Sequence, residues 1–352
     1  MKDKIVLTDN KRSLPLDILR IIAILAVILL HSAMTFLLYE PHTSEYIWGS
    51  VFDSISRLGV PIFVMISGAL MLDEKKDESS RVFLNRHIKK IVFIFIVWTG
   101  IYCASTICIH LINNESLSFE NIIYSLIEGP AHMWYLYMIV GLYLATPILK
   151  KFVSVKNKRL VLYYIVIALI ISFSKPFLQI IYPYFSHSKF IYNTIDGFYM
   201  DFFSGYVAYY LTGWYIFHVG IGEKKYRYIL YALSIVCALT IIIYVIVAGK
   251  HRLVYDNLSW FVYFYSLGIF VFVCEMLKNR THNNAVITKL SQLSFGVYLV
   301  HMLILNLTNA LMPVIQPYGI FVLLKFLITA PVSYGLCYIA SKIPFIKKCI
   351  RM

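Results

Sequence analysis

Apolar stretches long enough to cross a lipid bilayer recur along almost the whole chain. Of its 352 residues, 60% are hydrophobic and 14% are charged, a mixture that soluble globular domains do not have. About 20 consecutive apolar residues suffice for a helix to span the hydrocarbon layer. The pattern therefore predicts an all-α, polytopic integral membrane protein with about ten transmembrane helices, over residues 16–38, 46–72, 83–112, 132–153, 159–181, 198–219, 226–248, 258–277, 290–312 and 318–342.

The distribution of lysine and arginine predicts how these helices are oriented. If the N-terminus lies in the cytoplasm, the inner segments contain 25 of the 32 Lys and Arg residues, and only four fall in outer loops. Positive residues collect on the cytoplasmic side of membrane proteins, so we expect both termini to be cytoplasmic. The same bias accounts for the net charge of +14, and we infer no nucleic-acid partner from it.

The chain is interpreted as one transmembrane domain over residues 1–352, with cytoplasmic tails at 1–15 and 343–352. The first apolar stretch is too long for a signal peptide and has no cleavage pattern, so it is expected to remain as the first helix. A short amphipathic segment, 119–127, is expected to lie in the membrane interface. The six cysteines have no metal-like or redox-like spacing, and no metal site is expected.

The first helix contains three ionisable residues on one stripe. Arg20 and His31 are 11 residues apart, about three helical turns, so they share a face at a separation of about 16 Å, and Asp17 is close to the same face. Charged groups inside a bilayer are costly unless they face the bundle interior or a wet cavity. The stripe therefore indicates a functional site. The alternative is that Asp17 and Arg20 lie at the interface and that His31 is a packing residue.

A second buried cation, Arg57, is expected in the middle of the 46–72 helix, too deep to reach the interface easily. It needs an anionic partner, and Asp53 lies one turn earlier. A structural Asp53–Arg57 pair and a substrate-facing role for Arg57 are both open. Lys325, in the last apolar stretch, is a further cation that either has a partner or reaches the interface.

The start of the 83–112 helix carries Arg86, His87, Lys89 and Lys90 at its cytoplasmic end. Arg86 and Lys89 are three residues apart and share a helical face, a spacing suited to adjacent phosphate groups. Ordinary anchoring by positive charges is the alternative.

Several short patterns occur in a fixed order along the chain. Through the order and spacing of these patterns, the chain resembles the acyltransferase-3 family of integral membrane proteins, and within it the short, single-domain O-acetyltransferases. The patterns are Leu16-Asp17-x-Leu19-Arg20 followed by His31; Ser56-Arg57-x-x-Val60-Pro61-x-Phe63-x-x-x-Ser67-Gly68; His132-x-Trp134-Tyr135-Leu136 with Tyr143 and Pro147; and Ser294-Phe295-Gly296-x-Tyr298-Leu299-x-His301.

The resemblance implies transfer of an acyl group, in this case acetyl, from cytosolic acetyl-coenzyme A to a hydroxyl of a cell-surface glycan or lipid-linked glycan precursor, in a bacterial cytoplasmic membrane. It implies that Arg20 and His31 are needed for activity, and it matches Arg86 and Lys89 to a family pair of arginines. The lysine at the second position keeps the charge but not the bidentate geometry.

On this basis the candidate site has three parts. His31, Arg20 and Asp17 are the candidate catalytic residues, with His31 as general base or as acyl-carrying nucleophile. The candidates for donor binding are Arg86, Lys89, Lys90 and Arg57, and those for substrate binding are Trp134, Tyr135 and His301. Two other classes of function remain open: an exporter or flippase of an acylated sugar or small solute, and a scaffold in a glycan-assembly complex.

Overall fold

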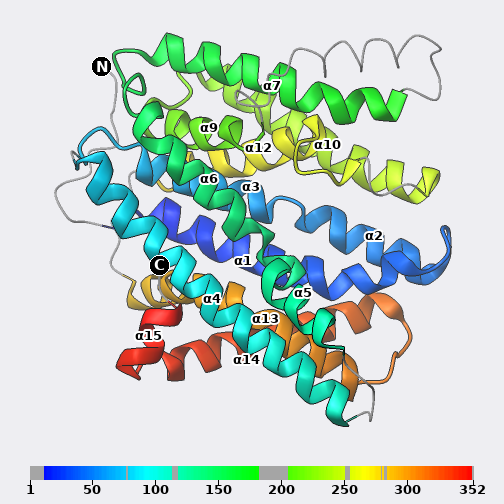
Figure 1. Ribbon diagram of the computed structural model, residues 1–352. Coiled ribbons are helices and arrows are strands. Elements are labelled where there is room, and N and C mark those ends of the chain that lie inside the picture. The colour runs from blue at the N-terminus through cyan, green and yellow to red at the C-terminus, as the bar shows by residue number, and fades with distance from the viewer. Residues whose placement is uncertain are drawn as a thin grey trace.

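The computed structural model describes residues 12–76, 78–112, 118–181, 205–249, 254–278, 280 and 284–350. Within these residues every regular element is a helix, in agreement with the predicted all-α class (Figure 1). The elements are α1 (Leu14–Met34), η1 (Thr35–Leu38), α2 (Ser44–Ser56), α3 (Gly59–Met71), α4 (Ser80–Ile112), α5 (Phe119–Glu128), η2 (Ala131–Met133), α6 (Trp134–Leu149), α7 (Lys158–Ile181), α9 (Val207–His218), α10 (Lys224–Ala248), α12 (Trp260–Met276), α13 (Ala285–Leu311), α14 (Tyr318–Ala340) and α15 (Pro344–Ile350).

Within the described residues, seven helical segments are long and apolar enough to cross a membrane. They are α1 with η1, α2 with α3, α4, η2 with α6, α10, α13 and α14. The predicted spans at 159–181 and 258–277 coincide with α7 and with the shorter apolar helix α12. The span predicted at 198–219 starts outside the described residues, which contain α9 in that region. The count of ten thus stays a prediction, while a membrane-embedded helical bundle is confirmed.

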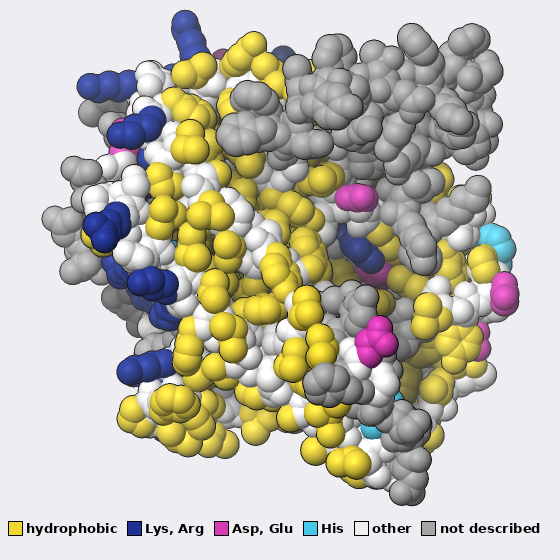
Figure 2. All heavy atoms as spheres, in the orientation of Figure 1, with side chains coloured by type: hydrophobic (Ala, Val, Ile, Leu, Met, Phe, Trp, Pro, Cys, Tyr) yellow, Lys and Arg dark blue, Asp and Glu magenta, His cyan; other side chains and the backbone are white. Residues whose placement is uncertain are grey.

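Basic side chains gather at one end of this bundle. The helix α1 begins and α15 ends at the same end in Figure 1, and Figure 2 shows Lys and Arg side chains at that edge, with hydrophobic side chains over much of the adjoining face. In an 18-residue apolar stretch of α4 only 28% of the residues are buried inside the protein, and in the corresponding stretch of α10 only 22%. The outer faces of these apolar helices are therefore suited to lipid contact. The assignment of the basic end to the cytoplasm remains a prediction.

The helix expected over residues 46–72 is interrupted at Arg57 and Leu58. Here α2 ends at Ser56 and α3 begins at Gly59. Proline has no amide hydrogen, so Pro61 cannot continue the hydrogen-bond ladder back to Arg57. Gly59 also packs closely on α1, where an added Cβ would lie 3.0 Å from the carbonyl oxygen of Ala23. The break brings Arg57 to a helix end, where its side chain can turn into the protein.

The helix α1 is the centre of the fold, since it packs against α2, α3, α13 and α14. Pro15 in its first turn suits a helix start. Beside it, α3 and α9 cross at very short range: a Cβ on Gly68 would overlap the carbonyl oxygen of Tyr210, and one on Gly213 that of Met65. Small residues allow this approach, which is a common way of packing membrane helices.

Two short helices, α5 and α15, fall in segments that the sequence placed outside the membrane-spanning helices. The amphipathic segment predicted at 119–127 is the helix α5, which packs on α4. The C-terminal tail predicted at 343–352 contains α15, which packs against α4, α13 and α14. Trp98 Nε1 donates a hydrogen bond to the backbone oxygen of Cys349 at 3.0 Å, so this part of the tail belongs to the folded protein.

Candidate functional site: a cavity along the first helix

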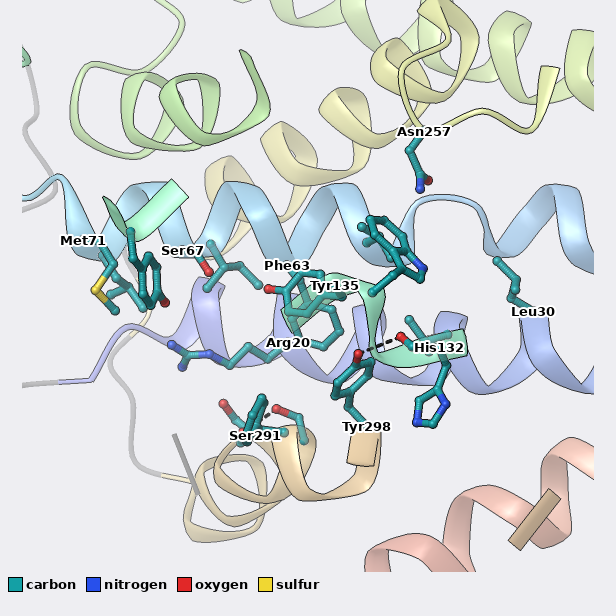
Figure 3. Close-up of a pocket in the computed structure, with 18 of the residues that line it drawn as sticks. Arg20, Leu30, Phe63, Ser67, Met71, His132, Tyr135, Asn257, Ser291 and Tyr298 are labelled. Carbon is teal, nitrogen blue, oxygen red and sulfur yellow. Dashed lines mark hydrogen bonds between the residues drawn. The ribbon is translucent and has the colours of Figure 1, made fainter. Parts of the chain in front are cut away.

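A cavity of about 770 Å³ follows one face of α1. Residues of α1, α2, α3, α4, η2, α6 and α13 contribute to its wall (Figure 3). Of the described residues that line it, none is acidic and five are basic: Arg12, Arg20, Arg57, Arg86 and Lys90. A concave space with this charge excess is suited to a ligand that carries negative charge.

Arg20 and the buried carboxylate of Asp17 form the centre of the basic end. The Asp17 carboxylate is 1% exposed and accepts hydrogen bonds from Arg12 (2.6 Å), from Arg20 (3.0 Å) and from the Ser291 hydroxyl of α13 (2.6 Å). A buried carboxylate with several charge-assisted hydrogen bonds holds its donors in fixed positions. Asp17 therefore orients two guanidinium groups toward this end of the cavity.

The start of α4 completes the same end. Arg86, His87 and Lys90 line the cavity, and the Glu78 carboxylate stands 4.0 Å from both Arg86 and His87. Lys89 is exposed and is not among the lining residues. The pair that faces the cavity is therefore Arg86 with Lys90, four residues apart, and not Arg86 with Lys89.

Three imidazole rings meet at the other end. The ring centre of His31 lies 5.3 Å from that of His301 and 6.5 Å from that of His132, and His132 and His301 are 5.4 Å apart. His31 and His132 line the cavity, whereas His301 is fully buried behind them. Along the α1 axis, His31 is about 16 Å from Arg20, so the cavity joins a basic end to a histidine cluster.

Arg57 lies in the wall of the same cavity, held from three sides. It donates to the Asp53 carboxylate at 2.6 Å and to the backbone oxygen of Tyr255 at 3.2 Å, and its guanidinium stands 4.2 Å from the centre of the Tyr255 ring. Burial raises the pKa of the Tyr255 hydroxyl, which therefore stays protonated and donates to the backbone oxygen of Ser50 at 2.8 Å. The predicted Asp53–Arg57 pair exists, and Arg57 still faces the cavity.

Aromatic and amide side chains form the wall near the histidines. Trp134 and Tyr135 line the cavity from the start of α6, and Asn257 lines it from the segment before α12. Figure 3 shows Tyr135 and Asn257 in this wall. Trp134 is 39% exposed and its ring centre lies 5.8 Å from that of Tyr206, whose hydroxyl accepts a hydrogen bond from Asn257 at 3.1 Å. This wall offers a flat apolar face beside polar groups.

A family model described as an acyltransferase domain matches residues 15–342, nearly the whole chain. The chain belongs to the acyltransferase-3 family. It is a membrane acyltransferase, and the matched region runs from α1 to beyond the end of α14, so it contains both ends of the cavity. No curated protein and no solved structure matches the chain.

Within this acyltransferase, most residues singled out in the sequence meet in one cavity. Arg20, His31, Arg57, Arg86, Lys90, Trp134 and Tyr135 line it, whereas Asp17, Lys89 and His301 do not. Asp17 and Arg20 lie at the end remote from His31. Sequence reasoning missed Arg12 and Ser291, and it named His132 and Tyr298 only as parts of family patterns. The proximity of His132 and His301 to His31 arises from packing between distant segments, which no local pattern signals.

Proposed function

We propose that this acyltransferase transfers an acetyl group from acetyl-coenzyme A to a hydroxyl of a cell-surface glycan or lipid-linked glycan precursor, in a bacterial cytoplasmic membrane. The observation that carries the proposal is the single cavity that connects a basic end to His31. Within the family, this proposal assigns the chain to the O-acetyltransferases.

The basic end suits the phosphates of the donor. Arg12, Arg20, Arg86 and Lys90 line it together with His87, and guanidinium groups pair with phosphate in bidentate geometry. From there the pantetheine arm would extend along α1. The separation of about 16 Å between Arg20 and His31 is comparable to the length of that arm. Arg20 is thereby assigned to donor binding, and Asp17 to holding Arg20.

His31 acts at the thioester in this proposal. As general base, its unprotonated ring nitrogen takes the proton of the acceptor hydroxyl while the hydroxyl oxygen forms a bond to the thioester carbon. The carbon–sulfur bond then breaks, and the proton passes to the departing thiolate, which yields free coenzyme A and the acetyl ester. Arg57, which lines the same cavity, is suited to stabilise the negative charge on the carbonyl oxygen.

The acceptor would lie against Trp134. An exposed indole face with Asn257 and Tyr206 beside it resembles the mixture of apolar surface and hydrogen-bonding groups that a sugar ring needs. Donor and acceptor would then approach His31 from different parts of one cavity.

The test is turnover of acetyl-coenzyme A by the purified protein, followed as release of free thiol, with lipid-linked glycan extracted from the source membrane as acceptor. We expect thiol release and acetyl esters in wild type, and loss of both in His31→Ala. His218→Ala is the matched control, because His218, at the end of α9, is hydrogen-bonded to the backbone oxygen of Ala69 on α3 and does not line the cavity. Equal activity in His31→Ala and His218→Ala would contradict the proposal.

The same preparation separates an acyltransferase from an exporter. In sealed liposomes that contain this protein alone together with the lipid-linked glycan acceptor, an acyltransferase consumes the thioester without moving solute. Transport of an acylated sugar with no consumption of acetyl-coenzyme A would support the exporter instead.

A further inference from the structure

Three ring nitrogens in the histidine cluster are buried and have no hydrogen-bond partner among the described residues. They are Nδ1 of His31, Nε2 of His132 and Nε2 of His301. Buried polar atoms are rarely left unpaired, and exceptions gather at functional sites. The cluster therefore holds hydrogen-bonding capacity that packing alone does not explain.

The proton on His301 is fixed by its backbone contact. Nδ1 of His301 lies 2.7 Å from the backbone oxygen of Tyr298. A carbonyl oxygen only accepts hydrogen bonds, so in a neutral imidazole the proton must be on Nδ1, and Nε2 is left as an acceptor. His301 is 0% exposed, and hence its Nε2 can be satisfied only by a neighbouring donor.

Two rings are close enough to His301 to supply this donor, that of His31 with its centre at 5.3 Å and that of His132 at 5.4 Å. Of the two, His31 is the ring that the proposed function places at the thioester, and the His132→Leu variant distinguishes them. Nδ1 of His31 is the buried, unpartnered nitrogen, while the ring lines the cavity. We propose that His301 is a positioning residue that accepts a hydrogen bond from Nδ1 of His31 and thereby keeps the bare Nε2 of His31 directed at the cavity. This inference rests on the proposed function, in which His31 needs an unprotonated nitrogen to receive the hydroxyl proton.

The ring separation supports this pairing. Two imidazoles joined by an N–H···N bond of about 3 Å have ring centres about 5 Å apart, and His31 and His301 are 5.3 Å apart with planes tilted by 39°. The torsion that turns an imidazole about its Cβ–Cγ bond is soft, so a small rotation brings the two nitrogens into line. His132 is the less suited partner of His31, at 6.5 Å and 81°.

The role resembles that of the carboxylate in a Ser-His-Asp triad, which holds the imidazole in one tautomer and orientation. Here a neutral ring replaces the carboxylate. A neutral orienting group avoids burying a second charge in a membrane-embedded core. His301 is accordingly reassigned from the substrate-binding residues predicted in the sequence, because it lies behind His31 and does not line the cavity.

The chemical reactivity of His31 tests this pairing without any turnover. Diethyl pyrocarbonate acylates unprotonated imidazole nitrogens, and mass spectrometry of the labelled protein reports each histidine separately. His87 lines the basic end of the same cavity, so its labelling rate is an internal measure of reagent access. We expect His301→Leu to slow labelling of His31 relative to His87 severalfold, and His301→Gln, whose amide oxygen still accepts a hydrogen bond, to preserve it.

Steady-state kinetics supply the second readout. We expect His301→Leu to lower kcat by about 100-fold, the lower end of the range for general-base catalysis, with KM for acetyl-coenzyme A unchanged. His301→Gln should recover most of kcat, and adding His301→Leu to His31→Ala should have no further effect. His218→Leu, assayed with thermal unfolding of each variant, controls for the loss of a packed histidine.

The outcomes separate this inference from the proposed function. If wild type does not turn over acetyl-coenzyme A, the function fails, while labelling still reports on the pair. If wild type is active but His301→Leu leaves both kcat and His31 labelling unchanged, the positioning role is wrong. The same holds if His132→Leu, and not His301→Leu, slows the labelling of His31.

Discussion

Replacement of Arg20 by glutamine separates donor binding from chemistry in this acyltransferase. The Arg20 side chain is 25% exposed, lines the basic end, and lies about 16 Å from His31 along α1. A hydrogen bond to a charged group contributes about 1.5 to 3 kcal/mol, which corresponds to about 10- to 150-fold in affinity. Because Arg12, Arg86 and Lys90 line the same end, we expect the lower part of this range, about tenfold weaker binding.

The variant should still fold. Without Arg20, the Asp17 carboxylate keeps its 2.6 Å contacts with Arg12 and with the Ser291 hydroxyl, so it is not left as an uncompensated buried charge. The expected change therefore concerns the ligand and not the fold, and an unchanged thermal unfolding midpoint would verify this.

The assay is calorimetric titration of coenzyme A itself, which carries all the phosphates of the donor but no acyl group. Arg20→Gln should bind it about tenfold more weakly, and the difference should shrink at high salt, which screens charges. His31→Ala should bind coenzyme A like wild type although its turnover is lost. Lys89→Gln is the matched control, since this exposed lysine does not line the cavity. Wild-type affinity in Arg20→Gln, or equal weakening in Lys89→Gln, would show that Arg20 does not bind the donor phosphates.

Three further predictions concern packing and the acceptor. Gly213→Ala should lower stability by about 1 to 3 kcal/mol in thermal unfolding, because the new Cβ overlaps the carbonyl oxygen of Met65, whereas Gly141→Ala, with open space around it, should not lower it. Lys325→Met should increase the free energy of unfolding by about 1 kcal/mol and so raise the unfolding temperature, because Lys325 is 1% exposed and has no carboxylate partner within the described residues. Trp134→Ala should raise KM for the glycan acceptor about three- to tenfold through the loss of stacking, with the affinity for coenzyme A unchanged; an unchanged acceptor KM would remove Trp134 from the acceptor site.

The part of the site that follows from local periodicity could be predicted from the sequence. Arg20 and His31 share a helical face whatever surrounds them, and both line the cavity. The charge pattern likewise indicated one basic end, where Lys and Arg side chains gather in Figure 2. The pairing of Arg57 with Asp53 also followed from a spacing of four residues within a helix.

Features that depend on distant segments could not be predicted in this way. Asp17 was predicted as a candidate catalytic residue, but its environment is set by Arg12 and by Ser291, 274 residues further along the chain. The choice between Lys89 and Lys90 depends on how α4 is rotated against α1, which a spacing of three or four residues does not decide. The interruption between α2 and α3 had a signal in Pro61, yet proline often only kinks membrane helices, so its extent required the structure.

The most direct measurement is the structure of this acyltransferase with coenzyme A bound. We expect the phosphates among Arg12, Arg20 and Arg86, the pantetheine arm along α1, and the sulfur within about 4 Å of the His31 ring, the range in which reacting groups meet. Phosphates bound beside Trp134, or a sulfur that does not reach His31, would contradict the proposed function.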